Sequence, residues 1–162
     1  MKLYQKLRAN WSNQHGGVLV WVALLLFVFI GIAALAIDIG YISTTKNELQ
    51  NVSDAAALGA AGEPGQVYLA NGVYDHDNDY DDIRDVVTVT LTNRAAGLDI
   101  LVDEADIEVG LWNFTSHTFD ASNTTFPNAV KVTARRDTTT NGPINALFAG
   151  IFNIDTFDVR TD

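Results

Sequence analysis

The feature that most constrains this chain is an unbroken apolar run near its start. Residues 18–37 read VLVWVALLLFVFIGIAALAI, without a single charged, amide or hydroxyl side chain. At about 1.5 Å of rise per residue, a helix over this run is about 30 Å long, which is the thickness of the hydrocarbon core of a bilayer. The run therefore predicts a transmembrane helix, and it excludes a plain cytosolic globule.

The distribution of charge predicts an orientation for this helix. Lys2, Lys6 and Arg8 precede the run, whereas all 20 acidic residues of the chain lie from Asp38 onward. Positively charged flanks stay on the cytoplasmic side of a membrane. We therefore expect residues 1–17 to form a basic cytoplasmic tail and everything after the run to lie on the opposite side.

A cleaved signal peptide is the competing interpretation of the same run. Ala33, Ala34 and Ala36 near its end resemble the small residues of a cleavage site. The run is, however, longer than the apolar region of about 7–15 residues in a signal peptide, and the sequence after Asp38 continues as a helix. We therefore expect a retained anchor over residues 18–37.

The helix is expected to continue beyond the membrane, over residues 38–61. No proline occurs between residues 39 and 61, and Gly62, Pro64 and Gly65 then break the helix. One face carries apolar and small side chains at intervals of three and four, as in a helix that packs on another surface. We expect this stripe to pack on the chain's own sheet and also to contact a partner. Its members are Ile42, Leu49, Val52, Ala56 and Gly59.

After the break the apolar period changes from 3.6 to 2, which predicts strands. We expect strands over residues 87–92, 98–102, 106–111 and 129–135, and a last strand from Thr156 to Asp162. That strand has no turn or cap after it, which leaves open whether the native chain continues. One short helix is expected over residues 143–153, with an apolar face of Ile144, Leu147, Phe148, Ile151 and Phe152. The fold class is therefore α+β: a long N-terminal transmembrane helix, then a mainly antiparallel β-sheet domain with one short helix over residues 66–162.

A dense run of acids is the most conspicuous polar feature. The alternate carboxylates of Asp75, Asp77, Asp79 and Asp81 are spaced like the first ligands of a calcium-binding loop, and calcium prefers six to eight oxygens. The run lacks the glycine and the final glutamate of an EF-hand loop, so a solvated acidic loop is the alternative. No cofactor other than this calcium ion is expected.

The composition excludes several classes of function. The chain has no cysteine, and therefore no disulfide framework, thiol nucleophile or thiolate zinc site. Its net charge of −10 makes a nucleic-acid partner improbable. His76 and His117 stand alone, and no nucleotide-binding, serine-hydrolase or zinc-protease motif occurs. We expect a protein that is not an enzyme.

Four blocks of sequence resemble one known family. Residues 34–41 read ALAIDIGY, residues 47–58 read NELQNVSDAAAL, residues 107–113 read IEVGLWN, and residues 127–136 read PNAVKVTARR. In this order they resemble the TadG-like (TadE/G-like) proteins of the Tad (Flp) tight-adherence pilus assembly system. The resemblance extends over nearly the whole chain, except the acidic segment of residues 75–85.

The resemblance implies a localisation and a role. It implies a single-pass protein of the bacterial inner membrane, with a cytoplasmic N-terminus, a pilin-like helix and a periplasmic or extracellular C-terminal domain. It implies a non-catalytic minor pilin-like or assembly component, with pilins or Tad assembly and secretion proteins as partners, and it leaves self-association or entry into a filament open. The alternative function is a membrane-tethered, calcium-binding adhesin or ligand-binding module.

One departure from the pattern of processed pilins concerns the N-terminus. Such pilins carry glutamate at the fifth position after a cleaved glycine. Cleavage after Gly16 or Gly17 would place Trp21 or Val22 there. We therefore predict that the anchor is not processed in the manner of a major pilin.

Overall fold

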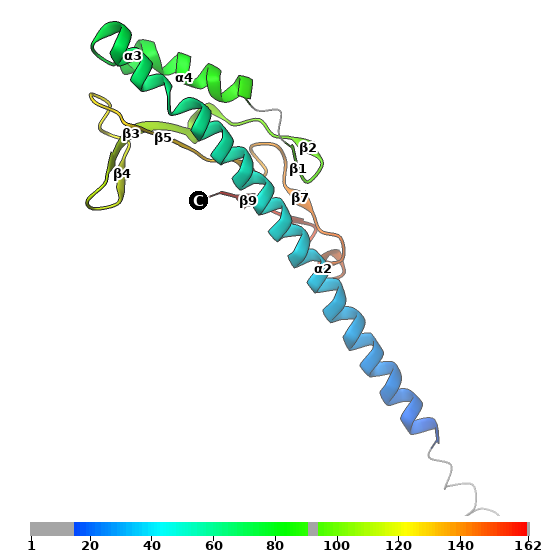
Figure 1. Cartoon of the computed structure of the whole chain (residues 1–162). Coiled ribbons are helices and arrows are strands. Elements are labelled where there is room, and N and C mark those ends of the chain that lie inside the picture. Colours follow the sequence, from blue (N-terminus) through cyan, green and yellow to red (C-terminus); the bar gives the residue numbers. More distant parts are fainter. Residues whose placement is uncertain (1–14, 91–93, 162) are drawn as a thin grey trace, which may run out of the picture.

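One long, continuous helix is the main element of the molecule in this computed structural model. The structure describes residues 15–90 and 94–161. Helix α2, His15–Ala60, has 46 residues and, at 1.5 Å per residue, a length of about 69 Å. It contains the apolar run and the predicted extension up to Ala60. Figure 1 shows α2 as the longest element of the molecule. Most of the predicted cytoplasmic tail lies outside the described residues.

Two shorter helices turn the chain back along the end of α2. Helix α3, Glu63–Asn71, begins just after Gly62, and Pro64 occupies its first turn, where its missing N–H costs nothing. Gly72 ends α3 in the left-handed conformation with φ of 74°. Helix α4, His76–Thr90, then lies beside α2 (Figure 1).

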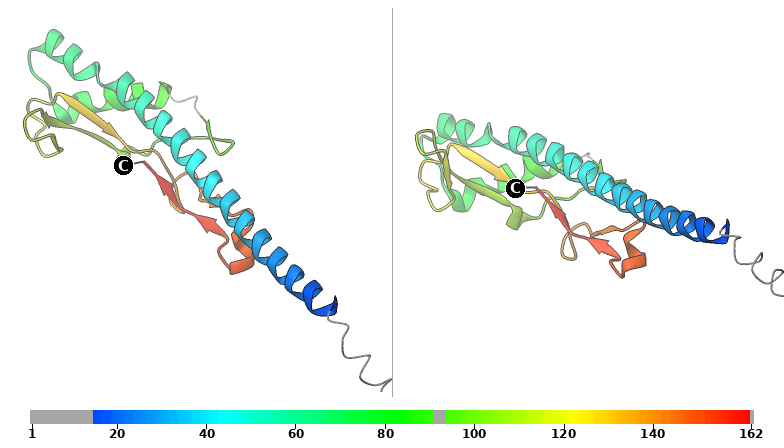
Figure 2. Two further views of the ribbon diagram at one scale, coloured as in Figure 1. Left: turned by 60° about the horizontal axis from the view of Figure 1, so that its bottom comes forward. Right: turned by 90° about the horizontal axis from the view of Figure 1, so that it is seen from below.

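The remaining elements are short antiparallel strands packed along the C-terminal half of α2, as Figure 2 shows from two further sides. The largest sheet has the order β4–β3–β5, formed by Thr118–Asp120, Ile107–Asn113 and Ala129–Val132. Three two-stranded sheets are β1 (Arg94–Ala95) with β2 (Leu98–Asp99), β6 (Arg135–Arg136) with β9 (Val159–Arg160), and β7 (Ile144–Asn145) with β8 (Thr156–Phe157). Two 3-10 helices are η1 (Glu104–Asp106) and η2 (Ala149–Phe152). The predicted α+β fold class is confirmed.

Two clusters of buried side chains join the outer domain to α2. Because α2 contributes small or branched residues three or four apart, strands and α4 approach it closely. The first cluster contains Ala56, Ala60, Val67, Tyr74, Ile83, Val87, Val102, Ile107, Val109 and Val132. The second cluster is nearer the apolar run and contains Leu49, Val52, Ala95, Ile100, Ala134, Ile144 and Val159.

The strand predicted over residues 87–92 is wrong for residues 87–90, which end α4; residues 91 and 92 lie outside the described part of the chain. Ile83 and Val87 are four residues apart and fully buried, so a helix directs both into the core. This packing overrides the local β-preference of alternating valine and threonine. The strand predicted over residues 98–102 is confirmed only at Leu98–Asp99.

The strand predicted over residues 106–111 is confirmed as β3, whereas the one over residues 129–135 is divided between β5 and β6 in separate sheets. The last strand is likewise divided into β8 and β9. The helix predicted over residues 143–153 is wrong for most of its length. Ile144 pairs with Phe157 in a hairpin and is buried, and only Ala149–Phe152 form a turn of 3-10 helix.

Gly110 in β3 marks a close approach of the chain after β4. A Cβ there would meet the carbonyl oxygen of Asp120 and lie 2.9 Å from the Cα of Ala121. We expect Gly110→Ala to lower the free energy of unfolding by about 1–3 kcal/mol, because the backbone must shift. The matched control is Gly65→Ala, where nothing lies within 4 Å of the added atom.

Denaturant unfolding of the full chain in detergent micelles, followed by near-ultraviolet circular dichroism, measures this difference. Gly65→Ala should be neutral or slightly stabilising, since alanine is favoured over glycine inside a helix. A Gly110→Ala protein as stable as the wild type would contradict the close approach.

Candidate functional site

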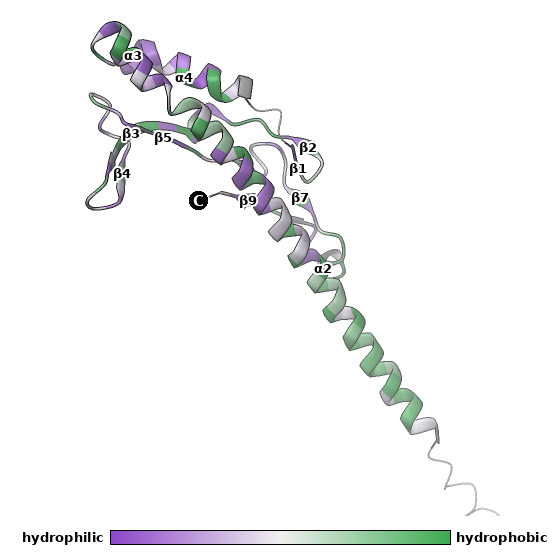
Figure 3. Ribbon diagram, viewed as in Figure 1, coloured by the Kyte–Doolittle hydropathy of each residue, from purple (hydrophilic) through white to green (hydrophobic). Residues whose placement is uncertain are grey.

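The N-terminal half of α2 has the surface of a membrane-spanning segment. Among the described residues, one helix is long and apolar enough to cross a membrane. The apolar side chains between Val18 and Ile37 are exposed, with Phe27 at 77%. In Figure 3 the ribbon of this half of α2 has the green of hydrophobic residues along most of its length, and it extends away from the outer domain. The core helix of a soluble protein would instead be covered by its own chain.

Asp38, the first charged residue after the apolar run, is buried at 3% exposure. Its carboxylate accepts hydrogen bonds from the backbone N–H groups of Leu147 at 2.9 Å, Phe148 at 3.1 Å and Ala149 at 2.6 Å. Hydrogen bonds from backbone N–H groups to a carboxylate are stronger than those between two neutral groups. Asp38 therefore fastens the β7–β8 hairpin to α2 at the end of the apolar run.

The part of the hairpin that Asp38 holds is residues 146–155, which we call the hairpin tip. Ala146 N–H donates to the carbonyl oxygen of Asp155 at 2.8 Å and closes the tip at its base. Inside it, η2 ends at Asn153, which adopts the left-handed conformation with φ of 63°. Figure 2 shows this orange to red segment at the end of the outer domain nearest the apolar half of α2.

The predicted interaction stripe is directed mainly into the protein's own core. Leu49, Val52 and Ala56 have no exposed surface, and Ile42 is half-buried against the second cluster. Gly59 is exposed. Packing on the chain's own strands and helices therefore accounts for four of the five residues, and contact with a partner stays a prediction.

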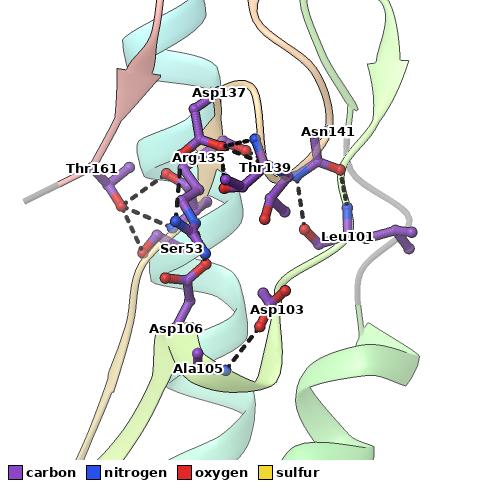
Figure 4. Close-up of polar contacts among 12 residues, drawn as sticks. Ser53, Leu101, Asp103, Ala105, Asp106, Arg135, Asp137, Thr139, Asn141 and Thr161 are labelled. Carbon is purple, nitrogen blue, oxygen red and sulfur yellow. Dashed lines mark hydrogen bonds and ion pairs between the residues drawn. The ribbon is translucent and has the colours of Figure 1, made fainter.

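Polar side chains join α2 to the segment that follows β9 (Figure 4). The Ser53 hydroxyl donates to the carbonyl oxygen of Val132 and accepts from the Thr161 hydroxyl at 3.4 Å. Thr161 Oγ1 also accepts from the backbone N–H of Ala134 at 2.9 Å. Since Ser53 and Thr161 are buried, these bonds satisfy polar atoms that would otherwise destabilise the core.

Arg135 is the centre of a second polar group in the same view. Its guanidinium is 2.6 Å from the carboxylate of Asp106 and 3.4 Å from that of Asp137. The hydrogen bonds from Thr139 and Thr140, helped by the charge of Arg135, lower the pKa of Asp137 to about 2. The neighbouring Arg136 donates to the carbonyl oxygens of Ala95, Gly142 and Pro143. Arg135 and Arg136 therefore both join separate segments of the chain.

This lowered pKa predicts sensitivity to acid. The carboxylate form of Asp137 is favoured by folding, so its contribution to stability is complete above its ordinary pKa near 4 and is lost as the pH falls towards 2. We expect Asp137→Asn to lose less stability than the wild type between these pH values. The control Asp158→Asn removes an exposed acid and should follow the wild type. Parallel acid dependences of Asp137→Asn and wild type, from denaturation at each pH, would contradict this role.

The candidate calcium ligands lie at the start of α4. The backbone N–H of Asp77 donates to the Asp75 carboxylate at 3.1 Å, and the backbone N–H of Asp75 donates to the Asp79 carboxylate at 2.7 Å. These two acids therefore cap the helix. Asp77 and Asp81 lie within the helix and are exposed. In the described part of the chain, no three acidic or histidine side chains are grouped closely enough to hold a metal ion.

Calcium binding stays a prediction with a direct test. Isothermal titration of the full chain in micelles, with Asp79→Asn as the comparison, should give heat from calcium binding below millimolar concentration if the acidic run is a site. No heat in that range would remove the calcium interpretation.

The two isolated histidines have different surroundings. His76 lies between the rings of Tyr74 and Tyr80, with centroids at 6.1 Å and 5.1 Å. Burial, followed by the nearby charge of Asp79, raises the pKa of Tyr74 to about 12. His117 is exposed in the turn between β3 and β4.

Three ties between distant segments were not predicted. The sequence marks Asp38 as the flank of the apolar run, and the one available signal is that a buried charge needs a partner. Glu48 accepts from the backbone N–H of Ala96 at 2.7 Å, and Asn141 bonds both backbone groups of Leu101 at 2.8–2.9 Å. No local pattern identifies partners that are so far apart in sequence.

Comparison with protein families gives two overlapping matches. Residues 16–63 match the family described as Flp pilus-assembly TadE/G-like, and residues 42–162 match the family described as Tad-like Flp pilus-assembly. The second match covers most of the chain, including the tie between Thr161 and α2. Searches of curated proteins and of solved structures found no match.

Proposed function

We propose that this chain, which belongs to the Tad-like Flp pilus-assembly family, is a non-catalytic, membrane-anchored, minor pilin-like component of a Tad (Flp) tight-adherence pilus. The observation that carries the proposal is the single helix α2, because an exposed apolar half continues without a break into the core of the outer domain. At about 1.5 Å per residue, such a helix reaches from a bilayer into the outer domain without an intervening loop.

The orientation is part of the proposal. The helix crosses the bacterial inner membrane once, with the basic residues Lys2, Lys6 and Arg8 in the cytoplasm. The acidic outer domain is then periplasmic or extracellular. The support is the charge difference between the two ends of the apolar run, together with the exposure of its side chains.

A shallow groove beside α2 is a candidate contact for a pilin or another Tad assembly protein. The groove has a volume of about 270 Å³ and lies between the face of α2 that carries Gln50 and Asp54 and the sheet residues Trp112, Phe119 and Lys131. Trp112 and Phe119 are half-buried in it, while Asp54 and Lys131 are exposed. Aromatic side chains are enriched in protein interfaces, and their rims are polar. Self-association through the same groove is compatible with the proposal.

A calcium-dependent adhesin is the second candidate, and it has less support. Its ligands would come from the acidic run, where Asp75 and Asp79 already use carboxylate oxygens to cap α4. Family membership favours the assembly role, because the family match extends over the same acidic residues.

Site-specific crosslinking in the native bacterium tests the proposed role. A photo-reactive amino acid at Asp54, in the groove, should give adducts that contain a pilin or a Tad assembly protein by mass spectrometry. The same group at Asp77, an exposed acid on α4, is the matched control. Adducts at Asp54 that contain only proteins unrelated to pilus assembly would contradict the proposal.

A further inference from the structure

The hairpin tip presents an unusual number of apolar side chains to the surroundings. The sequence pattern predicted that four of them share one apolar face with Ile144, namely Leu147, Phe148, Ile151 and Phe152. The structure separates them, because Ile144 is buried while these four are exposed. The exposed fractions are 57% for Leu147, 41% for Phe148, 80% for Ile151, 59% for Phe152 and 47% for Ile154. Clustered exposed apolar side chains of this size mark an interaction surface.

The position of the tip along α2 is set by Asp38. Three backbone N–H groups of the tip converge on this carboxylate, which follows directly after the apolar run that ends at Ile37. Three apolar residues of α2 within three positions of Asp38 are also exposed, namely Leu35, Ile37 and Ile39. The tip and the outer end of the apolar run therefore both present apolar side chains beside Asp38.

The charge of the tip is suited to a lipid surface rather than to a polar partner. Residues 143–157 contain no lysine or arginine, and Asp155 is their single acid. Two of the exposed side chains are phenylalanines and three are aliphatic, which matches the apolar face, though not the basic polar face, of segments that lie in the boundary between headgroups and acyl chains.

We propose that the hairpin tip inserts into the outer leaflet of the membrane that α2 crosses, so that the protein holds the bilayer at two points. The inference rests on the proposed membrane anchor. The apolar faces of interfacial helices are buried about 5–10 Å into the boundary between headgroups and acyl chains, and we expect a similar depth for the tip. Because Asp38 ties the tip to α2, insertion fixes the rotation and depth of the helix and the tilt of the outer domain above the membrane.

The absence of cysteine in the chain permits a direct test with single reporter residues. Ile151→Cys, labelled with an environment-sensitive fluorophore, is placed in phosphatidylcholine vesicles as the full-length protein. Emission should fall when the lipids carry a spin label near the top of the acyl chain, and it should fall less when the label is near the chain end. Labelled Leu69→Cys, exposed at 91% on α3 at the other end of the domain, should lose no emission.

A third reporter separates failure of the inference from failure of the anchor. Labelled Phe27→Cys, in the middle of the apolar run, should be quenched most strongly by the spin label near the chain end. Quenching of Phe27→Cys without quenching of Ile151→Cys would overturn the inserted tip and leave the anchor intact. No quenching at Phe27→Cys would overturn both.

A protein partner at the tip would give a different result. A second copy of the chain would shift the emission of labelled Ile151→Cys to shorter wavelength at high protein density, without quenching by any labelled lipid, and this outcome would contradict lipid insertion. In the double variant with Asp38→Ala, quenching at Ile151→Cys should weaken, because the tip is no longer held at the level of the membrane.

Discussion

Replacing Asp38 by alanine is expected to lower the free energy of unfolding of the outer domain by about 2–4 kcal/mol. The variant removes a buried carboxylate and leaves the N–H groups of Leu147, Phe148 and Ala149 without their acceptor. Hydrogen exchange at these amides should rise more than at β3, since the hairpin tip opens first.

Two controls separate the hydrogen bonds from the charge. Asp38→Asn keeps one acceptor oxygen and should lose less stability than Asp38→Ala. Asp155→Ala removes an exposed acid from the same hairpin and should stay near the wild type. Denaturant midpoints in micelles together with exchange mass spectrometry measure both effects, and unchanged exchange at residues 147–149 in Asp38→Ala would contradict the tie.

Leu49→Ala is expected to have the other large effect, a loss of about 2–5 kcal/mol. Leu49 has no exposed surface and lies in the cluster that joins α2 to the strands nearest the apolar run. Leu58→Ala is the matched control, because Leu58 lies on the same helix and is 80% exposed. Both changes alter helix propensity equally, so their difference isolates the packing.

Denaturation of the two leucine variants in the same micelles measures this difference. The account requires that Leu49→Ala shifts the midpoint strongly and Leu58→Ala hardly shifts it. Equal shifts would mean that the outer domain does not depend on α2 for its core.

The long helix and the central strand could be predicted because their patterns are local. The apolar run, the proline-free extension and the stripe through Leu49 indicated one helix over residues 18–61, and α2 extends from His15 to Ala60. The alternation around Val109 predicted β3, because one face of that strand is buried. Both signals depend on residues that are neighbours in the sequence.

The elements that were wrongly predicted depend on distant contacts. Residues 87–90 alternate as a strand does, but Ile83 and Val87 pack together from a helix. Residues 143–153 have helical spacing, but Ile144 pairs with Phe157 and is drawn into the core. In both segments, burial of one side chain outweighs the local preference of its neighbours.

The candidate site was predicted only in part for the same reason. The long apolar helix and the family were readable from the sequence. The tie through Asp38 joins residues 109–111 positions apart, so neither the tie nor the placement of the hairpin tip has a local pattern.

The central claim is that this membrane-anchored chain takes part in building Tad pili, and pilus number on living cells tests it most directly. Deletion of the gene in the native bacterium should abolish or strongly reduce surface Flp pili counted by electron microscopy. The wild-type gene should restore them, whereas a gene with Leu26→Arg in the apolar run should not, because a charge in the middle of the bilayer opposes insertion. Normal numbers of pili in the deletion strain would contradict the account.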